Sequence, residues 1–411
     1  MILFKLAWRN NWRHRWRSAL TLAAVVFGLS ITIWGFCITE GSHEQIILNS
    51  VESFTGHLQV HRSGFHDDPG LRKVFYPDSQ FVPRLNGDVP GLANWGFRIS
   101  TFGLASVGET SFAAMMVGIE PEREKEFIHW DQKIEQGSYL APDDIDGALV
   151  GADLAENLDI GVGDTVIIVT QDYYGSLAGA LRVVRGTVRS HAKELDRGGL
   201  LVSLASAREM LSMQGMANTA VVMATNSEQV PQLIAELRNR LEEDGLEVIG
   251  WRKIMPDIVQ AVELDNVFGV LTNLILLLVI GFTVLNTFLM SVMERIREFG
   301  IMRSLGASPG RIVGLIVFEA TLLVGLGFVL ANLVGIGASA YNSVYPLDFS
   351  EMGGDEIYKH YGMDPRIYAR LTWQTLVYPN IFVASVILLS LIYPAWRAAK
   401  IKPAEAVSRR R

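Results

Sequence analysis

The sequence contains one cysteine, Cys37, among its 411 residues. A single thiol excludes an internal disulfide framework and any metal site built from several thiolates. The chain also has no Gly-Lys pair, so it lacks the phosphate-binding loop in which a glycine precedes a lysine. Any energy that the protein uses must therefore come from a partner or from a gradient.

Charged residues are scarce and unevenly placed. They make up 19% of the chain, against 49% apolar residues and a mean hydropathy of +0.25, which is too apolar for an ordinary soluble enzyme. Residues 1–17, 291–311 and 394–411 hold 15 of the 36 Lys and Arg residues but only three of the 43 Asp and Glu residues. Basic patches within an acidic bulk exclude a nucleic-acid binder and favour contact with anionic membrane lipids on one side.

Four apolar stretches have the length of membrane crossings. They cover residues 19–38, 267–290, 312–341 and 376–393, and a helix of roughly 20 residues spans the hydrocarbon layer. The third is longer than one straight crossing and contains several glycines, so we expect it to tilt or to extend beyond the bilayer. The basic patches flank these stretches, and the positive-inside rule therefore places both termini and residues 294–310 in the cytoplasm.

The N-terminal segment has two parallel stripes of side chains. The aromatic stripe is Phe4, Trp8, Trp12 and Trp16, and the cationic stripe is Lys5, Arg9, Arg13 and Arg17. On a helix, this spacing predicts an amphipathic segment that lies in the cytoplasmic interface and contacts membrane lipids. A merely basic cytosolic tail is the alternative. No A-x-A-like site follows the first apolar stretch, so we expect an uncleaved anchor instead of a signal peptide.

Residues between the first and second crossings are numerous enough for a folded outer domain. Residues 55–61, 219–224 and 246–251 alternate or run apolar as strands do, and residues 227–241 have helical periodicity. We expect a mixed α+β unit formed by residues 42–104 and 216–257. Residues 105–215 are rich in strand and turn signals and are expected to form a β-rich insertion.

Two motifs suggest chemistry that the sequence does not support. Residues 306–310 read GASPG, the pattern of a hydrolase nucleophile elbow, but Pro309 has no backbone N–H for an oxyanion hole. The group His57, His61, His66, Asp67 and Asp68 resembles a metal site in composition. In a strand, however, His57 and His61 would stand about 13 Å apart. We therefore predict surface histidines and no metal site or catalytic residue.

Polar residues within the crossings are costly against lipid and are expected to face other helices. In the second crossing they include Asn286, and in the third they include Glu319, which is the ionisable residue of this set. A gradient-driven carrier would usually show more intramembrane charge. We expect Glu319 to be a structural partner for a cation at the cytoplasmic side, with a proton-relay role as the alternative.

Three segments carry a family resemblance. Residues 293–308 read MERIREFGIMRSLGAS, and residues 318–320 read FEA. Residues 393–407 read YPAWRAAKIKPAEAV, with Val407 where leucine is usual. Pieces of the outer domain, such as GVGDTV at residues 161–166, are similar but less specific. The chain resembles FtsX-like ABC transporter permeases of the MacB type, or type VII, over essentially its whole length.

The resemblance implies a four-crossing α-helical transmembrane domain with a large α+β periplasmic domain of porter and sabre subdomains. It implies an inner-membrane subunit that dimerises with a second copy or a related permease and binds a cytoplasmic ABC ATPase dimer, which holds the ATP and magnesium. The expected order is an interfacial helix at 1–17, crossings at 18–40, 265–293, 311–343 and 375–396, periplasmic segments at 41–264 and 344–374, and cytoplasmic segments at 294–310 and 397–411.

The segment at 294–310 is the expected ATPase-coupling element. Its expected contact residues are Glu294, Arg295, Arg297, Glu298, Phe299, Arg303 and Gly306. We expect Arg295, Glu298 and Arg303 to be exposed beside apolar side chains that include Phe299, as suits a helix that docks into a groove.

The layout, with no fused ATPase in the chain, is most similar to the lipoprotein-releasing permeases, which pass their substrates to a periplasmic carrier. Adaptor-dependent efflux and a non-transporting membrane scaffold or sensor are the alternatives.

Overall fold

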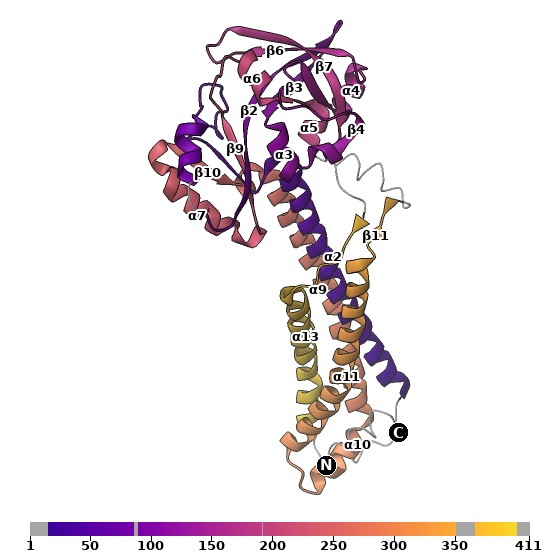
Figure 1. Cartoon of the computed structure of the whole chain (residues 1–411). Helices are drawn as coiled ribbons and strands as arrows, with labels where there is room; N and C mark the ends of the chain where they lie inside the picture. Colours follow the sequence, from indigo (N-terminus) through magenta and orange to yellow (C-terminus); the bar gives the residue numbers. More distant parts are fainter. Residues whose placement is uncertain (1–14, 86–88, 191, 351–365, 401–411) are drawn as a thin grey trace. The chain divides into compact units, whose positions relative to one another are not determined.

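The computed structural model describes residues 15–85, 89–190, 192–350 and 366–400. The chain divides into two compact units, which are described separately. The membrane unit comprises residues 1–44, 261–349 and 366–411, and the second unit comprises residues 45–260 and 350–365. Figure 1 traces both along the sequence.

Four long helices build the membrane unit, and each contains one of the four predicted apolar stretches and is long and apolar enough to cross a membrane (Figure 1). They are α2 (Arg15–Ser50), α9 (Pro256–Glu294), α11 (Pro309–Val344) and α13 (Trp373–Ala399). Each helix is longer than its predicted apolar stretch because polar turns continue the helix at one or both ends. A short helix, α10 (Ile296–Ser304), connects α9 to α11, and a two-stranded ribbon, β11 (Leu347–Asp348) with β12 (Arg366–Ile367), lies between α11 and α13.

The glycines of α11 differ in what surrounds them. A Cβ on Gly335 would lie 3.1 Å from the Cβ of Ile33 and 3.2 Å from the Ser30 backbone, both on α2. Ser30 Oγ also donates to the Ala331 carbonyl at 2.9 Å. By contrast, a Cβ on Gly337 would meet nothing within 4 Å. Gly335 therefore permits close packing of α11 on α2, as small residues do between membrane helices.

We expect Gly335→Val to destabilise the membrane unit by about 1–3 kcal/mol, because the added atoms overlap the α2 backbone. Gly337→Val is the matched control, since it adds the same side chain to the same helix in open space. Thermal unfolding of the purified protein in detergent should show a lower midpoint for Gly335→Val alone. Equal midpoints for the two variants would contradict this packing.

The second unit contains one sheet of ten strands. Its long strand β2 (Leu92–Val107) takes part in both halves of this sheet. The first half of β2 pairs with β9 (Thr219–Ala224), and the order β10-β1-β9-β2 continues through β1 (Leu58–Arg62) and β10 (Leu246–Gly250). Helix α7 (Val230–Leu241) joins β9 to β10 and buries Val230, Leu233, Leu237 and Leu241, as its periodicity predicts.

The second half of β2 belongs to a closed ring of strands. The pairings run β2-β3-β8-β5-β7-β6 and return to β2. The ring strands are β3 (Thr110–Ile119), β5 (Gly147–Gly151), β6 (Thr165–Gln171), β7 (Leu177–Val188) and β8 (Gly199–Ser203), and β4 (Ile134–Gly137) pairs with β7. Closure leaves these strands with no unpaired edge within the ring.

Short helices accompany the ring strands. They are α3 (Pro121–Phe127), α4 (Ala152–Leu158), α5 (Lys193–Gly198) and α6 (Leu204–Met210), and α8 (Trp251–Ile254) follows β10. The expected division of the domain fell at residue 104, within β2. In the structure the pairing of β2 changes from β9 to β3 between Arg98 and Ile99. The long strand therefore serves both halves of the unit, which a boundary read from turn signals does not reveal.

Candidate functional site

Helix α10 lies between two membrane helices and is bounded by defined breaks. Arg295 leaves the helical conformation after α9 ends. Gly306 has φ +90°, and its N–H bonds to the Arg303 carbonyl at 3.1 Å, which ends α10. Ser308 and Pro309 then begin α11 at its N-cap and first turn. Residues 306–310 are thus a helix–helix connection and not a strand-to-helix nucleophile elbow.

Arg295 anchors this short helix to α11. Its Nη1 lies 2.7 Å from Glu319 Oε2, and its Nε lies 3.0 Å from Glu298 Oε2. The Arg295 side chain is 13% exposed and that of Glu319 is 6% exposed. The guanidinium also lies 4.9 Å from the centre of the Phe299 ring. Glu319 therefore has the cation partner that the sequence led us to expect.

The expected exposure of the coupling residues is partly wrong. Phe299 is fully buried, and it packs in a cluster with Val292, Ile312, Ile316 and Ala398. Arg295 is largely buried by its pairing with Glu319, and Arg303 is half-buried with its Nε enclosed and without a partner among the described residues. Phe299 and Arg295 therefore hold α10 in place and contribute little to its surface, whereas Arg303 Nη1 bonds to the Ala307 carbonyl of the same connection.

The surface of this segment comes from other residues. Glu294, Arg297, Glu298, Ile301, Leu305 and Gly306 are exposed, with Ile301 at 45% and Leu305 at 82%. An apolar pair beside charged side chains is the composition of a helix that binds in a partner's groove. The sequence analysis did not identify Leu305 as a contact residue, because its spacing suggests a place on the buried apolar face of α10. In the structure, Leu305 lies just beyond the last turn of α10 and is exposed.

The remaining predicted residues are spread along the membrane unit. Trp16 is 80% exposed at the start of α2, as a ring in contact with lipid would be. Trp8, Arg9, Trp12 and Arg13 lie outside the described residues. Asn286 was expected to face another helix, but within this chain it is exposed. The neighbouring Thr287, and not Asn286, points toward α2, where it bonds to Thr21 at 3.0 Å. A helix that Asn286 faces would therefore lie outside this chain, and the expected packing role stays a prediction.

A buried polar cluster in the second unit was not predicted. Arg98 of β2 and Glu124 of α3 form a bidentate ion pair at 2.6 and 2.7 Å, with 1% and 0% of their side chains exposed. Trp130 Nε1 donates to the same carboxylate at 2.7 Å. The signal available in the sequence was an arginine flanked by the apolar residues Phe97 and Ile99. That signal does not identify Glu124 as the partner of Arg98.

The same cluster holds the end of the helix that leaves the membrane unit. Helix α2 continues as one turn of π-helix, Val51–Thr55. Arg98 Nη1 donates to the Phe54 carbonyl at 2.6 Å, and Lys133 Nζ donates to the Glu52 carbonyl at 3.1 Å. Burial lowers the pKa of Lys133 to about 8. Two cations thus satisfy carbonyls at a helix end that has no basic residue of its own.

His57 and His61 are not surface residues, so that prediction is wrong. They are 6% and 3% exposed, because β1 is an interior strand between β10 and β9. His61 stacks on Phe65 with ring centres 4.7 Å apart, and its Nδ1 lies 3.0 Å from the Asn218 carbonyl. Burial lowers the pKa of both histidines, and that of His61 falls to about 4.

This pKa predicts a pH dependence of stability. Between about pH 4 and pH 6.5 the unfolded chain binds a proton at His61 and the folded chain does not, so the free energy of unfolding rises with pH in this window. The difference across the window is about 3 kcal/mol for His61. Denaturant titrations followed by tryptophan fluorescence should show this slope. The slope should flatten in His61→Gln, and an unchanged slope there would assign the effect to other groups.

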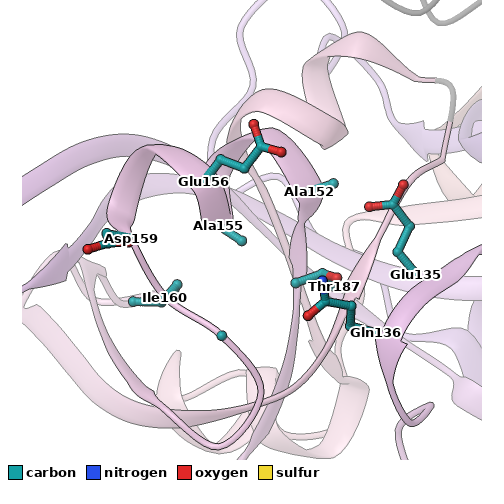
Figure 2. A pocket seen from close by; sticks show the side chains of 9 residues that line it. Glu135, Gln136, Ala152, Ala155, Glu156, Asp159, Ile160 and Thr187 are labelled. Atoms are coloured by element: carbon teal, nitrogen blue, oxygen red, sulfur yellow. The ribbon is translucent and has the colours of Figure 1, made fainter.

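A shallow pocket of about 310 Å³ opens beside α4 in the second unit. Figure 2 shows Glu156 and Asp159 on one side, and Glu135 and Gln136 beside Thr187 on the other. Glu135 is paired with Arg189. The lining contains no histidine, cysteine or lysine, and within the described part of the chain no three His, Cys, Asp or Glu residues are placed to hold a metal ion. This pocket supports no catalytic assignment.

Comparison with known proteins identifies the family. Residues 270–403 match the FtsX-like permease C-terminal family, and residues 18–240 match the MacB-like periplasmic core domain. The lipoprotein-releasing system transmembrane protein LolC of Xylella fastidiosa (strain Temecula1) is 24% identical over 98% of this chain and 96% of its own length. The macrolide export ATP-binding/permease protein MacB of Hyphomonas neptunium is 26% identical, covering 81% of this chain and 52% of that protein.

Among solved structures, the periplasmic region of MacB from Actinobacillus actinomycetemcomitans aligns with a TM-score of 0.36 at 17% identity, over 53% of this chain and 98% of that one. The two family matches cover residues 18–240 and 270–403, and the periplasmic core match alone spans more than half of the chain. The chain therefore belongs to the FtsX-like, MacB-type family of ABC transporter permeases.

Proposed function

We propose that this protein is the membrane subunit of a transporter that uses ATP hydrolysis by a separate cytoplasmic ATPase dimer to release lipoproteins from the inner membrane to a periplasmic carrier. The observation that carries the proposal is α10, a short helix with exposed Ile301 and Leu305 that is anchored to α11 by Arg295 and Glu319. Its fixed attachment suits an element that passes motion of a bound ATPase to the membrane helices.

The proposed topology follows from the charges. Basic residues flank α10 and the ends of α2 and α13 that lie nearest the termini, so these parts are cytoplasmic and the second unit is periplasmic. ATP and magnesium are bound by the ATPase, because this chain has no phosphate-binding loop. The second membrane subunit is another copy of this chain or a related permease.

The turn between β6 and β7 provides an exposed apolar surface that a periplasmic partner could contact. Tyr174 and Leu177 are 70% and 82% exposed there. The turn is ordered by Asp172, whose Oδ1 accepts from the N–H groups of Tyr174 and Ser176 at 3.0 and 2.8 Å. Large apolar side chains held out on a fixed turn favour protein contact.

Lipoprotein release is favoured over efflux by the length of the match. The LolC relative aligns along nearly its whole length, whereas about half of the MacB relative lies outside the alignment. Adaptor-dependent efflux of hydrophobic molecules or peptides remains the second candidate, because the periplasmic core match is named after MacB.

The test is affinity purification of the tagged protein from its native membrane in mild detergent. We expect a P-loop ATPase and acylated lipoprotein in the eluate, with ATP hydrolysis that responds to lipoprotein. An ATPase together with an adaptor and an outer-membrane channel would establish efflux instead. An eluate without ATPase would favour a membrane scaffold or sensor. So would an ATP hydrolysis rate, measured in lipid, that does not change when lipoprotein is added.

A pair of matched variants sharpens this test. Leu305 and Leu177 are both 82% exposed, one on each unit, so aspartate at either position should leave folding intact. Leu305→Asp should lose the ATPase and retain any periplasmic partner. Leu177→Asp should retain the ATPase and lose the periplasmic partner. Loss of both partners from both variants would show general damage and not two separate contacts.

A further inference from the structure

Between residues 275 and 290, one exposed face of α9 carries four apolar side chains and one polar side chain, Asn286. Ile275, Val279, Phe282 and Met290 are 63%, 60%, 65% and 49% exposed, and Asn286 is exposed between the last two. The spacing of these five residues, four, three, four and four, puts them on one side of the helix. Asn286 lies four residues from the end of the apolar stretch, about 6 Å along the axis, and so within the hydrocarbon layer.

Asn286 differs from the three other asparagines that lie within the apolar stretches of α9, α11 and α13. Asn273, Asn332 and Asn380 each donate Nδ2 to the carbonyl four residues earlier, at 2.8 Å in every case. Asn332 and Asn380 also bond to each other in both directions at 2.9 Å, which joins α11 to α13. The side chain of Asn286 makes no hydrogen bond to any residue that the structure describes.

We propose that this face of α9 packs against the same face of a second copy of the chain, with Asn286 bonded to Asn286 of the partner subunit. An amide offers both a donor and an acceptor, so two copies related by a two-fold axis can satisfy each other, as Asn332 and Asn380 do. Lipid tails offer neither group. This inference rests on the proposed pairing of two permease subunits and names the surface that forms the pair.

The exposed apolar face of α13, a helix that the structure describes in full, by contrast has no polar side chain that lacks a hydrogen bond in its central turns. On α13, Leu388, Leu389 and Ile392 are 64%, 66% and 61% exposed, and the exposed Ser385, about one turn before them, donates to the Ile381 carbonyl of its own helix. Lipid satisfies such a face. The unbonded amide therefore distinguishes α9 as the helix that meets another protein surface.

Cysteine cross-linking tests the proposal directly in native membranes. The chain has one cysteine, which is buried, so Cys37→Ala gives a cysteine-free background. In that background, Asn286→Cys and Phe282→Cys should form disulfide-linked dimers on oxidation. Leu388→Cys is the matched control, because Leu388 and Phe282 are 64% and 65% exposed, and it should remain a monomer.

Cross-linking at Leu388 with none at Phe282 or Asn286 would overturn the proposal. So would a cross-linked product containing a different permease, because the second subunit would then be a relative and not a copy. The cross-link does not require ATP, so failure of ATPase association or of lipoprotein release leaves this result unchanged and tests the proposed function separately.

The role of the amide itself is tested by comparing Asn286→Leu with Asn286→Gln. Leucine keeps an apolar surface and removes the bond, and it should lower the association constant of two copies about tenfold. Glutamine retains the donor and acceptor and should retain most of the association. Subunit counting by single-molecule photobleaching in lipid gives the measurement, and equal association for both variants would rule out the amide contact.

Discussion

Replacing Arg98 by methionine is expected to destabilise the second unit by about 3–5 kcal/mol, because it leaves the Glu124 carboxylate buried without its cation. Glu124 is fully buried and accepts two bonds from Arg98, at 2.6 and 2.7 Å. Trp130 would remain as its hydrogen-bond donor, and one neutral donor does not compensate a buried charge. Chemical denaturation followed by tryptophan fluorescence measures the loss.

A surface ion pair provides the control for this prediction. Arg240 and Glu236 lie four residues apart on α7, with Nε and Oε1 at 2.7 Å and side chains 26% and 42% exposed. Arg240→Met should cost less than about 1 kcal/mol, since exposed pairs contribute little. The double variant Arg98→Met with Glu124→Leu should recover part of the stability by removing both charges. A loss for Arg98→Met no larger than that for Arg240→Met would contradict the assignment.

The cluster of Arg98, Glu124 and Trp130 also fixes the chain at the end of α2. Arg98 and Lys133 bond to carbonyls of Phe54 and Glu52 in the turn that ends the helix. Gly56 then turns the chain into β1 with φ +74°, and a side chain there would collide with Val221. The end of α2 is therefore fixed to the core of the second unit by charge and by geometry.

The sequence predicts elements whose signal is local. The four membrane helices follow from apolar length, and α7 follows from buried residues at helical spacing. Tertiary pairing is not local. The ring of strands depends on β6 pairing with β2, more than 60 residues earlier, and no periodicity encodes that contact. His61 was misplaced for the same reason, because its burial comes from neighbouring strands that are distant in sequence.

The coupling segment illustrates the same limit within a recognised motif. Alternating charged and apolar residues at 294–310 indicated a helix with two faces, and α10 is that helix. The sequence did not show which face is buried, because Phe299 is covered by residues of α11 and α13. Arg295 reads as a surface cation until Glu319, 24 positions later, is seen beside it.

We expect removal of the bond between Arg295 and Glu319 to uncouple the transporter. In Glu319→Leu, the largely buried guanidinium of Arg295 loses a bond of 2.7 Å and retains its contacts with the more exposed Glu298 and with the Phe299 ring. Helix α10 then loses its charged link to α11 while its apolar contacts through Phe299 remain. We predict that substrate-stimulated ATP hydrolysis of the assembled complex falls by about tenfold, equivalent to about 1.4 kcal/mol of lost coupling, while the ATPase still co-purifies.

Two further variants separate an anchoring role from a proton-carrying role of Glu319. Glu44→Leu removes an ion pair outside the coupling segment, between Arg370 Nη1 and Glu44 Oε1 at 2.6 Å, and should change stimulation little, because these side chains are 41% and 31% exposed. The exchange Arg295→Glu with Glu319→Arg restores opposite charges at the two positions and should recover stimulation. A proton relay requires the carboxylate at position 319 itself, so the exchanged pair would stay inactive in that case. Recovery by the exchanged pair, with ATPase binding unchanged throughout, is the result that assigns Arg295 and Glu319 to the mechanical link between the ATPase and the membrane helices.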